Sequence, residues 1–154
     1  MATDRSTKTP DLSPDEALNC TCFNLRKAAR AVTQVYDAAL QPVGLKSTQF
    51  SLLAAAGAAE GRTVGQLAEA LVLDRTTLTR NLAPLVRDGL ISVEEGSDRR
   101  ARLVEVTPAG RRLLKRAWPL WRGAQARMVG DLGDRQWADL LTRLNATVAA
   151  AQDV

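Results

Sequence analysis

The sequence contains no histidine among its 154 residues, and this absence narrows the functions open to the protein. It removes the commonest general base, the Ser-His and Cys-His catalytic pairs and most zinc sites. A Gly-rich phosphate loop, a metal-spaced cluster and the G-x-S-x-G motif are missing from the sequence as well. We therefore expect a protein that is not an enzyme and that uses no metal and no cofactor.

Long apolar runs are also missing. No uninterrupted apolar stretch approaches the roughly 20 residues needed to cross a bilayer. The opening residues, MATDRSTKTPDL, contain no apolar segment of the kind found in signal peptides. We expect residues 1–12 to form a mobile tail on a cytoplasmic protein, in which Cys20 and Cys22 are reduced.

Lysine is scarce, with 4 Lys against 17 Arg, and the formal net charge is +4. The positive charge is unevenly placed. From Arg75 to Arg116 there are 10 basic and 5 acidic residues, whereas from Met128 to the end there are 2 basic and 4 acidic residues. This distribution is typical of a surface that faces nucleic-acid phosphates, although a solvated basic face gives the same pattern.

The N-terminal segment predicts one long amphipathic helix. Ser13 to Glu16 form a capping box with proline at the first helical position, and the helix is expected to run to about Leu40. Apolar residues recur on one face at spacings of three and four: Leu18, Cys22, Leu25, Ala29, Val32, Tyr36 and Ala39. A stripe of this length needs a partner surface, so residues 13–44 are interpreted as a dimerisation helix.

Residues 45–107 match the pattern of a winged helix-turn-helix, which is three helices followed by a β-hairpin. The predicted helices cover residues 47–57, 63–71 and 75–89, and the hairpin covers residues 90–106. The expected caps are Ser47 or Thr48 for the first helix, Thr63 with Gln66 for the second and Asp74 for the third. A unit of about 60 residues is only marginally stable by itself, which again favours packing against other helices.

Residues 108–154 predict two further helices. Thr107 caps the first, Pro119 is expected to bend or interrupt it, and Gly133 ends it. Asp134 is expected to cap the last helix, whose apolar residues share one face: Trp137, Leu140, Leu141, Leu144 and Val148. The predicted fold class is therefore mainly α with a small β-hairpin wing, and the terminal helices of two copies are expected to form a homodimer.

The helix over 75–89 separates into two faces. Leu78, Leu82 and Leu85 fall on one side and predict a buried ridge, while Thr76, Arg80, Ala83 and Arg87 gather opposite, with Thr77 and Pro84 at the edge. Small side chains let a helix enter the major groove, where arginine can bond to guanine and threonine can contact thymine or phosphate. The other interpretation is an amphipathic surface helix with a solvated face.

The hairpin tip contains Asp98, Arg99 and Arg100, although a tight turn requires no arginine. If the preceding helix enters the major groove, the hairpin is a wing whose arginines reach the neighbouring minor groove. Phosphate repels Asp98, which is instead expected to orient Arg100 or to hold Arg75.

These residues resemble the MarR family of bacterial transcriptional regulators. The resemblance is carried by the D-R-R of the wing, by DRTTLTR at residues 74–80, by DGLI at 88–91 and by VTPAG at 106–110, and it covers nearly the whole chain from about Glu16. It implies a homodimer that binds a pseudo-palindromic operator, usually as a repressor, and that is released by a small phenolic or aromatic acid or by cysteine oxidation. It also implies DNA contacts for Arg75, Thr76, Thr77 and Arg80, and a wing role for Asp98 and Arg100.

The segment NCTCFNLRKAAR contains the candidates for sensing. In one intact helix, Cys20 and Cys22 point about 160° apart and cannot bridge. One thiol can sense oxidant or bridge to a second subunit; alternatively, Arg26 can hold the carboxylate of an aromatic effector with Phe23 as an apolar wall. The simplest interpretation is that Cys22 is a small buried apolar residue and Cys20 an incidental neighbour.

A winged-helix module that serves only protein contacts is the remaining alternative. A titration with random-sequence duplex at several salt concentrations discriminates between the two classes, because phosphate binding weakens as salt rises.

Overall fold

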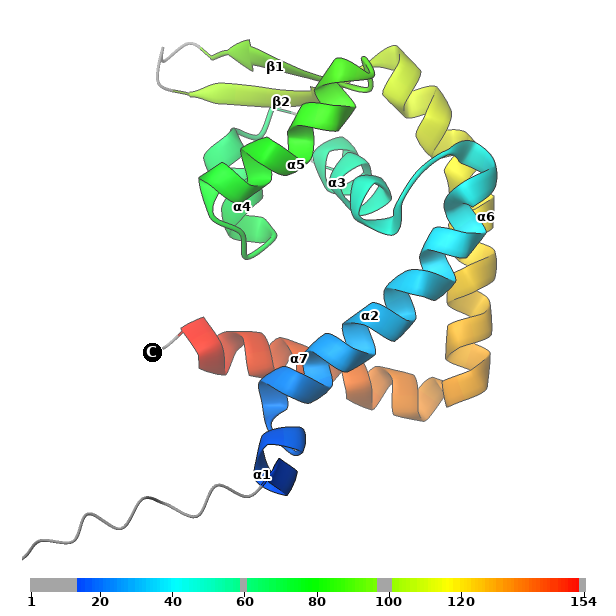
Figure 1. The fold of residues 1–154 in the computed structure, drawn as a ribbon. Coiled ribbons are helices and arrows are strands. Elements are labelled where there is room, and N and C mark those ends of the chain that lie inside the picture. Colours follow the sequence, from blue (N-terminus) through cyan, green and yellow to red (C-terminus); the bar gives the residue numbers. More distant parts are fainter. Residues whose placement is uncertain (1–13, 59–60, 97–100, 153–154) are drawn as a thin grey trace, which may run out of the picture. The chain divides into compact units, whose positions relative to one another are not determined.

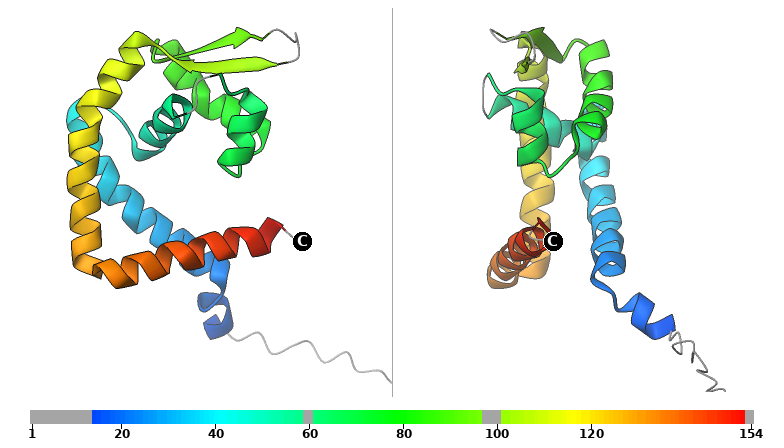
Figure 2. Two further views of the ribbon diagram at one scale, coloured as in Figure 1. Left: turned by 180° about the vertical axis from the view of Figure 1, so that it is seen from behind. Right: turned by 90° about the vertical axis from the view of Figure 1, so that its left-hand side faces the viewer.

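The computed structural model describes residues 14–58, 61–96 and 101–152 and divides the chain into two units, residues 1–34 and 35–154. Figures 1 and 2 show the elements as ribbons. The first unit holds α1 (Pro14–Leu18) and the first part of α2 (Thr21–Leu40). Every described side chain of this unit is exposed within the chain, including the apolar stripe.

The predicted single helix from Ser13 to Leu40 is wrong, because the helix breaks at Asn19 and Cys20. The Phe23 N–H donates to the Cys20 Sγ (3.2 Å), and the Asn24 side-chain amide donates to the Leu18 carbonyl (2.8 Å) and the Cys20 carbonyl (3.1 Å). These side chains replace the backbone partners of a continuous helix. Cys20 thus precedes α2, and the 160° argument against a bridge to Cys22 no longer applies. Ser13, the expected cap, lies outside the described residues.

The second unit contains the end of α2 and all later elements. They are η1 (Gln41–Val43), α3 (Ser47–Gly57), α4 (Val64–Ala70), α5 (Arg75–Arg87), β1 (Ile91–Glu95), β2 (Arg102–Val106), α6 (Pro108–Leu132) and α7 (Asp134–Gln152). The strands form an antiparallel hairpin in which Ile91 pairs with Val106 and Glu95 with Arg102. The Val104 N–H also donates to the Arg62 carbonyl (2.9 Å), which ties the segment before α4 to the hairpin.

One apolar core joins α3, α4, α5, the hairpin and the start of α6. Its largest fully buried side chains are Leu40, Leu53, Leu67, Leu78, Leu85, Ile91 and Val104. This confirms the predicted fold class, a winged helix-turn-helix between additional helices. Helix α6 continues through Pro119, and Figure 2 shows it changing direction along its length. Of the two effects expected of Pro119, the helix therefore shows a bend and not an interruption.

The start of α6 is bound closely to the end of the helix-turn-helix. The Thr107 Oγ1 donates to the Gly89 carbonyl (2.7 Å), the Thr107 N–H donates to the Leu90 carbonyl (3.1 Å), and the Gly110 N–H donates to the Thr107 Oγ1 (3.1 Å). Thr107 is thus both the predicted cap of α6 and a link to the residues that follow α5. Gly110 is buried here, and a Cβ at this position would collide with the Leu90 carbonyl.

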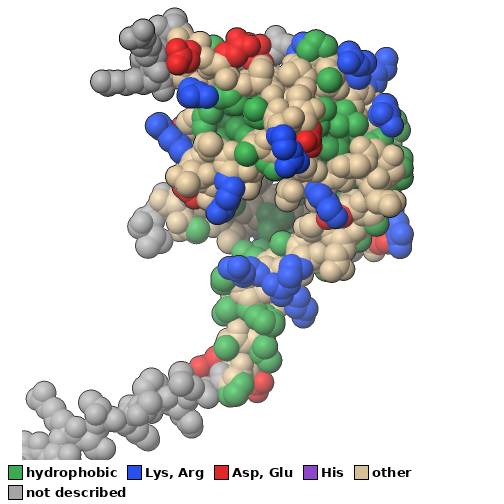
Figure 3. Space-filling view, turned by 45° about the horizontal axis from the view of Figure 1, so that its top comes forward, with side chains coloured by type: hydrophobic (Ala, Val, Ile, Leu, Met, Phe, Trp, Pro, Cys, Tyr) green, Lys and Arg blue, Asp and Glu red, His purple; other side chains and the backbone are tan. Residues whose placement is uncertain are grey.

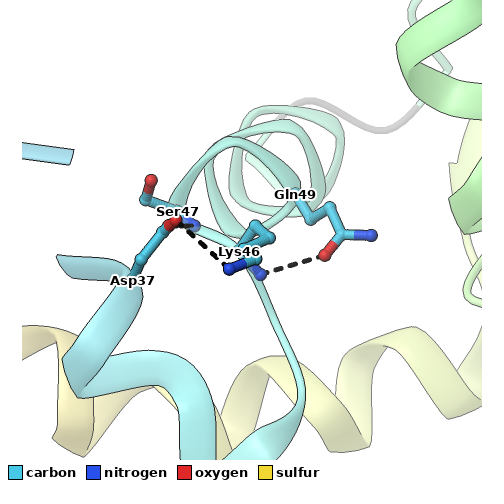
Figure 4. Close-up of polar contacts among 4 residues, drawn as sticks. All are labelled: Asp37, Lys46, Ser47 and Gln49. Carbon is cyan, nitrogen blue, oxygen red and sulfur yellow. Dashed lines mark hydrogen bonds and ion pairs between the residues drawn. The ribbon is translucent and has the colours of Figure 1, made fainter. Parts of the chain in front are cut away.

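A second link joins the end of α2 to the start of α3 (Figure 4). The Ser47 N–H donates to the Asp37 Oδ1 (2.7 Å), the Lys46 Nζ lies 3.6 Å from the Asp37 Oδ2, and the Lys46 N–H donates to the Gln49 Oε1 (2.9 Å). The hydrogen bond from the Ser47 backbone is the main reason why the pKa of the Asp37 carboxyl is lowered. The expected cap at Ser47 or Thr48 is therefore wrong: α3 begins after Lys46, and its acceptor comes from another helix.

Candidate nucleic-acid interface

Helix α5 begins where the sequence predicted it. The Asp74 Oδ1 accepts the Thr77 N–H (2.8 Å) and the Asp74 Oδ2 accepts the Thr77 hydroxyl (2.6 Å). The hydroxyl, followed by the backbone N–H, lowers the pKa of the Asp74 carboxyl. The Thr79 hydroxyl donates to the Arg75 carbonyl (2.8 Å), so it is also used within the helix. The first turn of α5 is fixed by side chains that the sequence places three and four residues apart.

The two predicted faces of α5 are confirmed as buried and exposed. Leu78, Leu82 and Leu85 are each no more than 2% exposed and pack into the core. The opposite residues Thr76, Arg80, Ala83 and Arg87 are exposed, whereas Thr77 is half-buried against its cap. The helix therefore presents small and cationic side chains to the outside, and the DNA contacts assigned to them stay predictions.

The turn between α4 and α5 has two unusual features. Val72 has φ 54° and is the single non-glycine residue with positive φ among those that the structure describes; it is 55% exposed. The left-handed region is costly for a β-branched side chain. The Arg75 guanidinium covers the first turn of α4, since a Cβ at Gly65 would lie 3.0 Å from its Nη2. Helix α4 itself begins with the predicted pair, in which Gln66 N–H donates to Thr63 Oγ1 and Thr63 N–H to Gln66 Oε1.

A groove of about 840 Å³ lies between α4, α5 and the hairpin. Three arginines line it, Arg75 and Arg87 from α5 and Arg102 from β2, and its other lining residues include Thr63, Val64, Gly65, Thr79, Leu82, Ala83, Val86, Val93 and Ala101. The Arg87 Nε lies 3.0 Å from the Asp88 Oδ1, and this exposed pair leaves most of the guanidinium in water. Figure 3 shows a face on which basic side chains clearly exceed acidic ones. The groove matches a surface that binds a polyanion.

Sequence reasoning missed Arg102 and Thr79. Arg102 is four residues beyond the acid of the D-R-R motif, and the pairing of Glu95 with Arg102 brings it to the end of the strand pair. The available signal was the position of Arg102 as the first residue of the apolar run RLVEV, which was already predicted as a strand of the hairpin. The wing-tip candidates Asp98, Arg99 and Arg100 lie outside the described residues.

The sensing candidates Cys20, Cys22, Phe23 and Arg26 all belong to the first unit, and all four are exposed within the chain. None of them lines the groove beside α5. Cys22 is exposed within the single chain, so its burial, the simplest interpretation of the sequence, stays a prediction that requires a dimer partner.

Two negative findings apply to the ranges 14–58, 61–96 and 101–152. No group of three or more His, Cys, Asp or Glu side chains in these ranges is placed to hold a metal ion. No helix within them has the length and apolar character needed to span a membrane.

A helix-turn-helix followed by a hairpin, with cationic side chains on the exposed face of its third helix, defines a winged-helix DNA-binding protein. Residues 43–101 match the model of the MarR family. The chain is 32% identical over 121 residues to the transcriptional activatory protein BadR of Rhodopseudomonas palustris, covering 75% of this chain and 69% of BadR. The protein belongs to the MarR family of transcriptional regulators and is not an enzyme.

Solved structures agree with this assignment. The Mycobacterium tuberculosis regulator MosR in complex with DNA is 43% identical, with a TM-score of 0.76 over 85% of this chain and 98% of that chain. The structure of a transcriptional repressor, CouR, bound to a 23-mer DNA duplex is 30% identical in sequence, with a TM-score of 0.74 over 90% of this chain and 99% of that chain.

Proposed function

We propose that this protein is a cytoplasmic homodimer that binds a pseudo-palindromic operator, acts as a repressor and is released by a small aromatic or phenolic ligand. The observation that carries the proposal is the exposed face of α5 beside a groove lined by three arginines. A helix entering the major groove needs base-reading side chains at its start and phosphate contacts on both flanks. Here Arg80 is the candidate for a base, and Arg87 and Arg102 are the candidates for phosphates.

Dimerisation is supported by apolar side chains that the chain leaves in water. On α7, Leu140, Leu141 and Val148 are 41–42% exposed, and in the first unit Leu18, Phe23, Leu25 and Val32 are exposed as well. Apolar residues that recur on one helix face need a covering surface, and a second copy supplies an identical one. A dimer also presents two copies of α5, which requires two half-sites in the operator.

The test is DNA binding by matched variants. A duplex selected from random DNA by the pure protein is titrated at several salt concentrations with wild type, Arg80→Ala and Arg112→Ala. Arg112 is exposed on α6 and does not line the groove, so it controls for the loss of one positive charge. Arg80→Ala is expected to cost about 1–3 kcal/mol and to relax preference at one operator position, because a bidentate base contact is lost.

The result can contradict the assignment in two ways. If Arg80→Ala keeps both the affinity and the sequence preference of the wild type, Arg80 does not contact a base, and the proposed role of α5 is wrong. If the wild type binds duplex without salt dependence, the groove does not bind phosphates, and a protein-interaction module becomes the better interpretation. A reporter gene downstream of the selected operator decides between repression and activation.

Redox sensing is the second candidate, and one observation favours it. Cys20 is exposed, lies outside α2, and accepts the Phe23 N–H with its Sγ. Oxidation of Cys20 attaches oxygen or a second sulfur to the atom that accepts this bond. It is therefore expected to change the geometry at the start of α2. Peroxide treatment of the wild type and of the Cys20→Ser, Cys22→Ser double mutant tests the idea: equal operator binding by both after oxidation excludes it.

A further inference from the structure

Gly65 lies in the first turn of α4 and, together with Arg75, lines the groove beside α5. It is not one of the glycines with positive φ, so its backbone conformation does not require glycine. Glycine also disfavours a helix more than any other residue except proline. The reason for a glycine at this position therefore lies in the space around it.

The Arg75 guanidinium occupies that space. A Cβ at Gly65 would lie 3.0 Å from the Arg75 Nη2, 3.3 Å from its Nε and 3.4 Å from its Cζ. The three distances are similar, so the planar group rests against α4 at the point where a side chain is missing. These atoms are the end of a flexible side chain. An added methyl group at Gly65 would therefore push the guanidinium aside and leave α4 in place.

The other end of the Arg75 side chain is fixed by the first turn of α5. Asp74 caps this turn by accepting the N–H and the hydroxyl of Thr77. The Arg75 carbonyl accepts the Thr79 hydroxyl (2.8 Å). Arg75 thus starts from a fixed backbone and ends on a second helix. A long side chain that is held in this way loses less conformational freedom on binding, and its charge has a defined place.

The direction of the Arg75 side chain indicates which part of DNA it can bind. Five residues separate Arg75 from Arg80, so the two side chains leave α5 about 140° apart. Arg80 lies on the exposed face with Thr76 and Arg87, whereas Arg75 follows the flank of the helix toward α4. When a recognition helix lies in the major groove, the bases meet its exposed face, and the preceding helix crosses the sugar-phosphate backbone. The exposed guanidinium of Arg75 is therefore placed for a phosphate.

We propose that Gly65 is a positioning residue for DNA binding: the absence of a side chain there lets the Arg75 guanidinium lie against α4, where it binds a phosphate and reads no base. The inference rests on the proposed function, because it requires α5 to enter the major groove. It gives Arg75 a role different from that of Arg80, the candidate for a base contact. It also assigns a role in DNA binding to a residue that has no side chain of its own.

A double-mutant cycle tests this role. The wild type, Gly65→Ala, Gly65→Val, Arg75→Ala and the two combined variants are titrated at several salt concentrations. The probes are the selected operator duplex, a random-sequence duplex and operators that carry single base changes. Gly123→Ala, at a helical glycine whose Cβ would meet no atom within 4 Å, controls for the exchange of a glycine, and Arg112→Ala, outside the groove, controls for the loss of one positive charge. Thermal melts show whether each variant is folded.

Arg75→Ala is expected to bind operator and random duplex about tenfold more weakly, with unchanged base preferences, and to reduce the slope of log K against log salt by about one for each bound subunit. Gly65→Ala is expected to bind about threefold and Gly65→Val about tenfold more weakly, because the displaced guanidinium loses its geometry. Neither Gly65 variant should weaken binding further in the Arg75→Ala protein. Gly65→Ala should melt no lower than the wild type, since alanine favours the helix.

Several results would overturn the proposal. If Arg75→Ala binds like the wild type, Arg75 contacts no phosphate, and if it changes the preference at one operator position, Arg75 reads a base. If the Gly65 variants bind like the wild type, the position of the guanidinium does not matter. Equal losses from Gly65→Val with and without Arg75 show that position 65 acts on DNA or on α4 directly. A wild type that binds no duplex contradicts the proposed function as well, whereas an additive cycle in a protein that binds DNA contradicts this inference alone.

Discussion

Replacing Gly110 by alanine tests how tightly the wing is joined to α6. The added Cβ would collide with the backbone carbonyl of Leu90 and would lie 2.7 Å from the Val106 Cγ1. Overpacking of a buried site typically costs about 1–3 kcal/mol, and a backbone obstacle places this substitution at the upper end. Alanine recovers up to about 1 kcal/mol of helix propensity. The expected net loss is therefore about 2 kcal/mol, which for a chain of this length lowers Tm by about 4–8 °C.

Gly123 is the matched control for this substitution. It lies in the same helix, but a Cβ at Gly123 meets no atom within 4 Å. Gly123→Ala is therefore expected to stabilise the protein by about 0.5–1 kcal/mol, because only the flexibility of glycine is lost. Both variants are compared with the wild type by thermal melts at one protein concentration, since a dimer melts in a concentration-dependent way. A Gly110→Ala protein as stable as the wild type would refute the close packing of α6 on Leu90.

Three further predictions concern the turn, the link between α2 and α3, and α7. Val72→Gly is expected to stabilise the protein by about 1 kcal/mol, because glycine removes the strain of a β-branched residue in the left-handed region. The control Val86→Gly lies in a helix and is expected to destabilise the protein by about 1 kcal/mol. If thermal melts show Val72→Gly to be less stable than Val86→Gly, the turn is not strained. The pKa of Asp37 is lowered, so its carboxylate stabilises the fold at any pH above the ordinary carboxyl pKa and loses this effect as pH falls through the lowered pKa. The Tm of the wild type should therefore exceed that of Asp37→Asn at neutral pH, and this difference should disappear in acid. A Tm difference that is unchanged at low pH contradicts the link between α2 and α3. Leu144→Glu should give monomers in sedimentation and Asn145→Glu should not, and a wild type that is already monomeric at micromolar concentration removes the basis of the dimer.

The sequence by itself determined the elements that depend on neighbouring residues. The buried ridge of α5 follows from the spacing of Leu78, Leu82 and Leu85, and the caps at Thr63, Asp74 and Thr107 bond to groups three residues away. The hairpin was readable from two short apolar strands around a turn. In each case the interacting groups lie within one or two turns of each other, so the spacing of residues specifies the contact.

The tertiary structure alone decided the contacts between residues far apart in the chain. The acceptor for the Ser47 N–H comes from Asp37 on another helix, Arg102 joins two arginines of α5 at one groove, and Gly110 is required by the carbonyl of Leu90. The break before α2 could not be predicted for a different reason. It depends on the side chains of Cys20 and Asn24, which compete with the backbone hydrogen bonds of a helix, and the spacing of apolar residues gives no information on such hydrogen bonds. A cleft of about 550 Å³ between α3, β2 and α6 is lined by Gly57, Val106 and Trp118 among others, and only the packing of these three elements decides which side chains meet there.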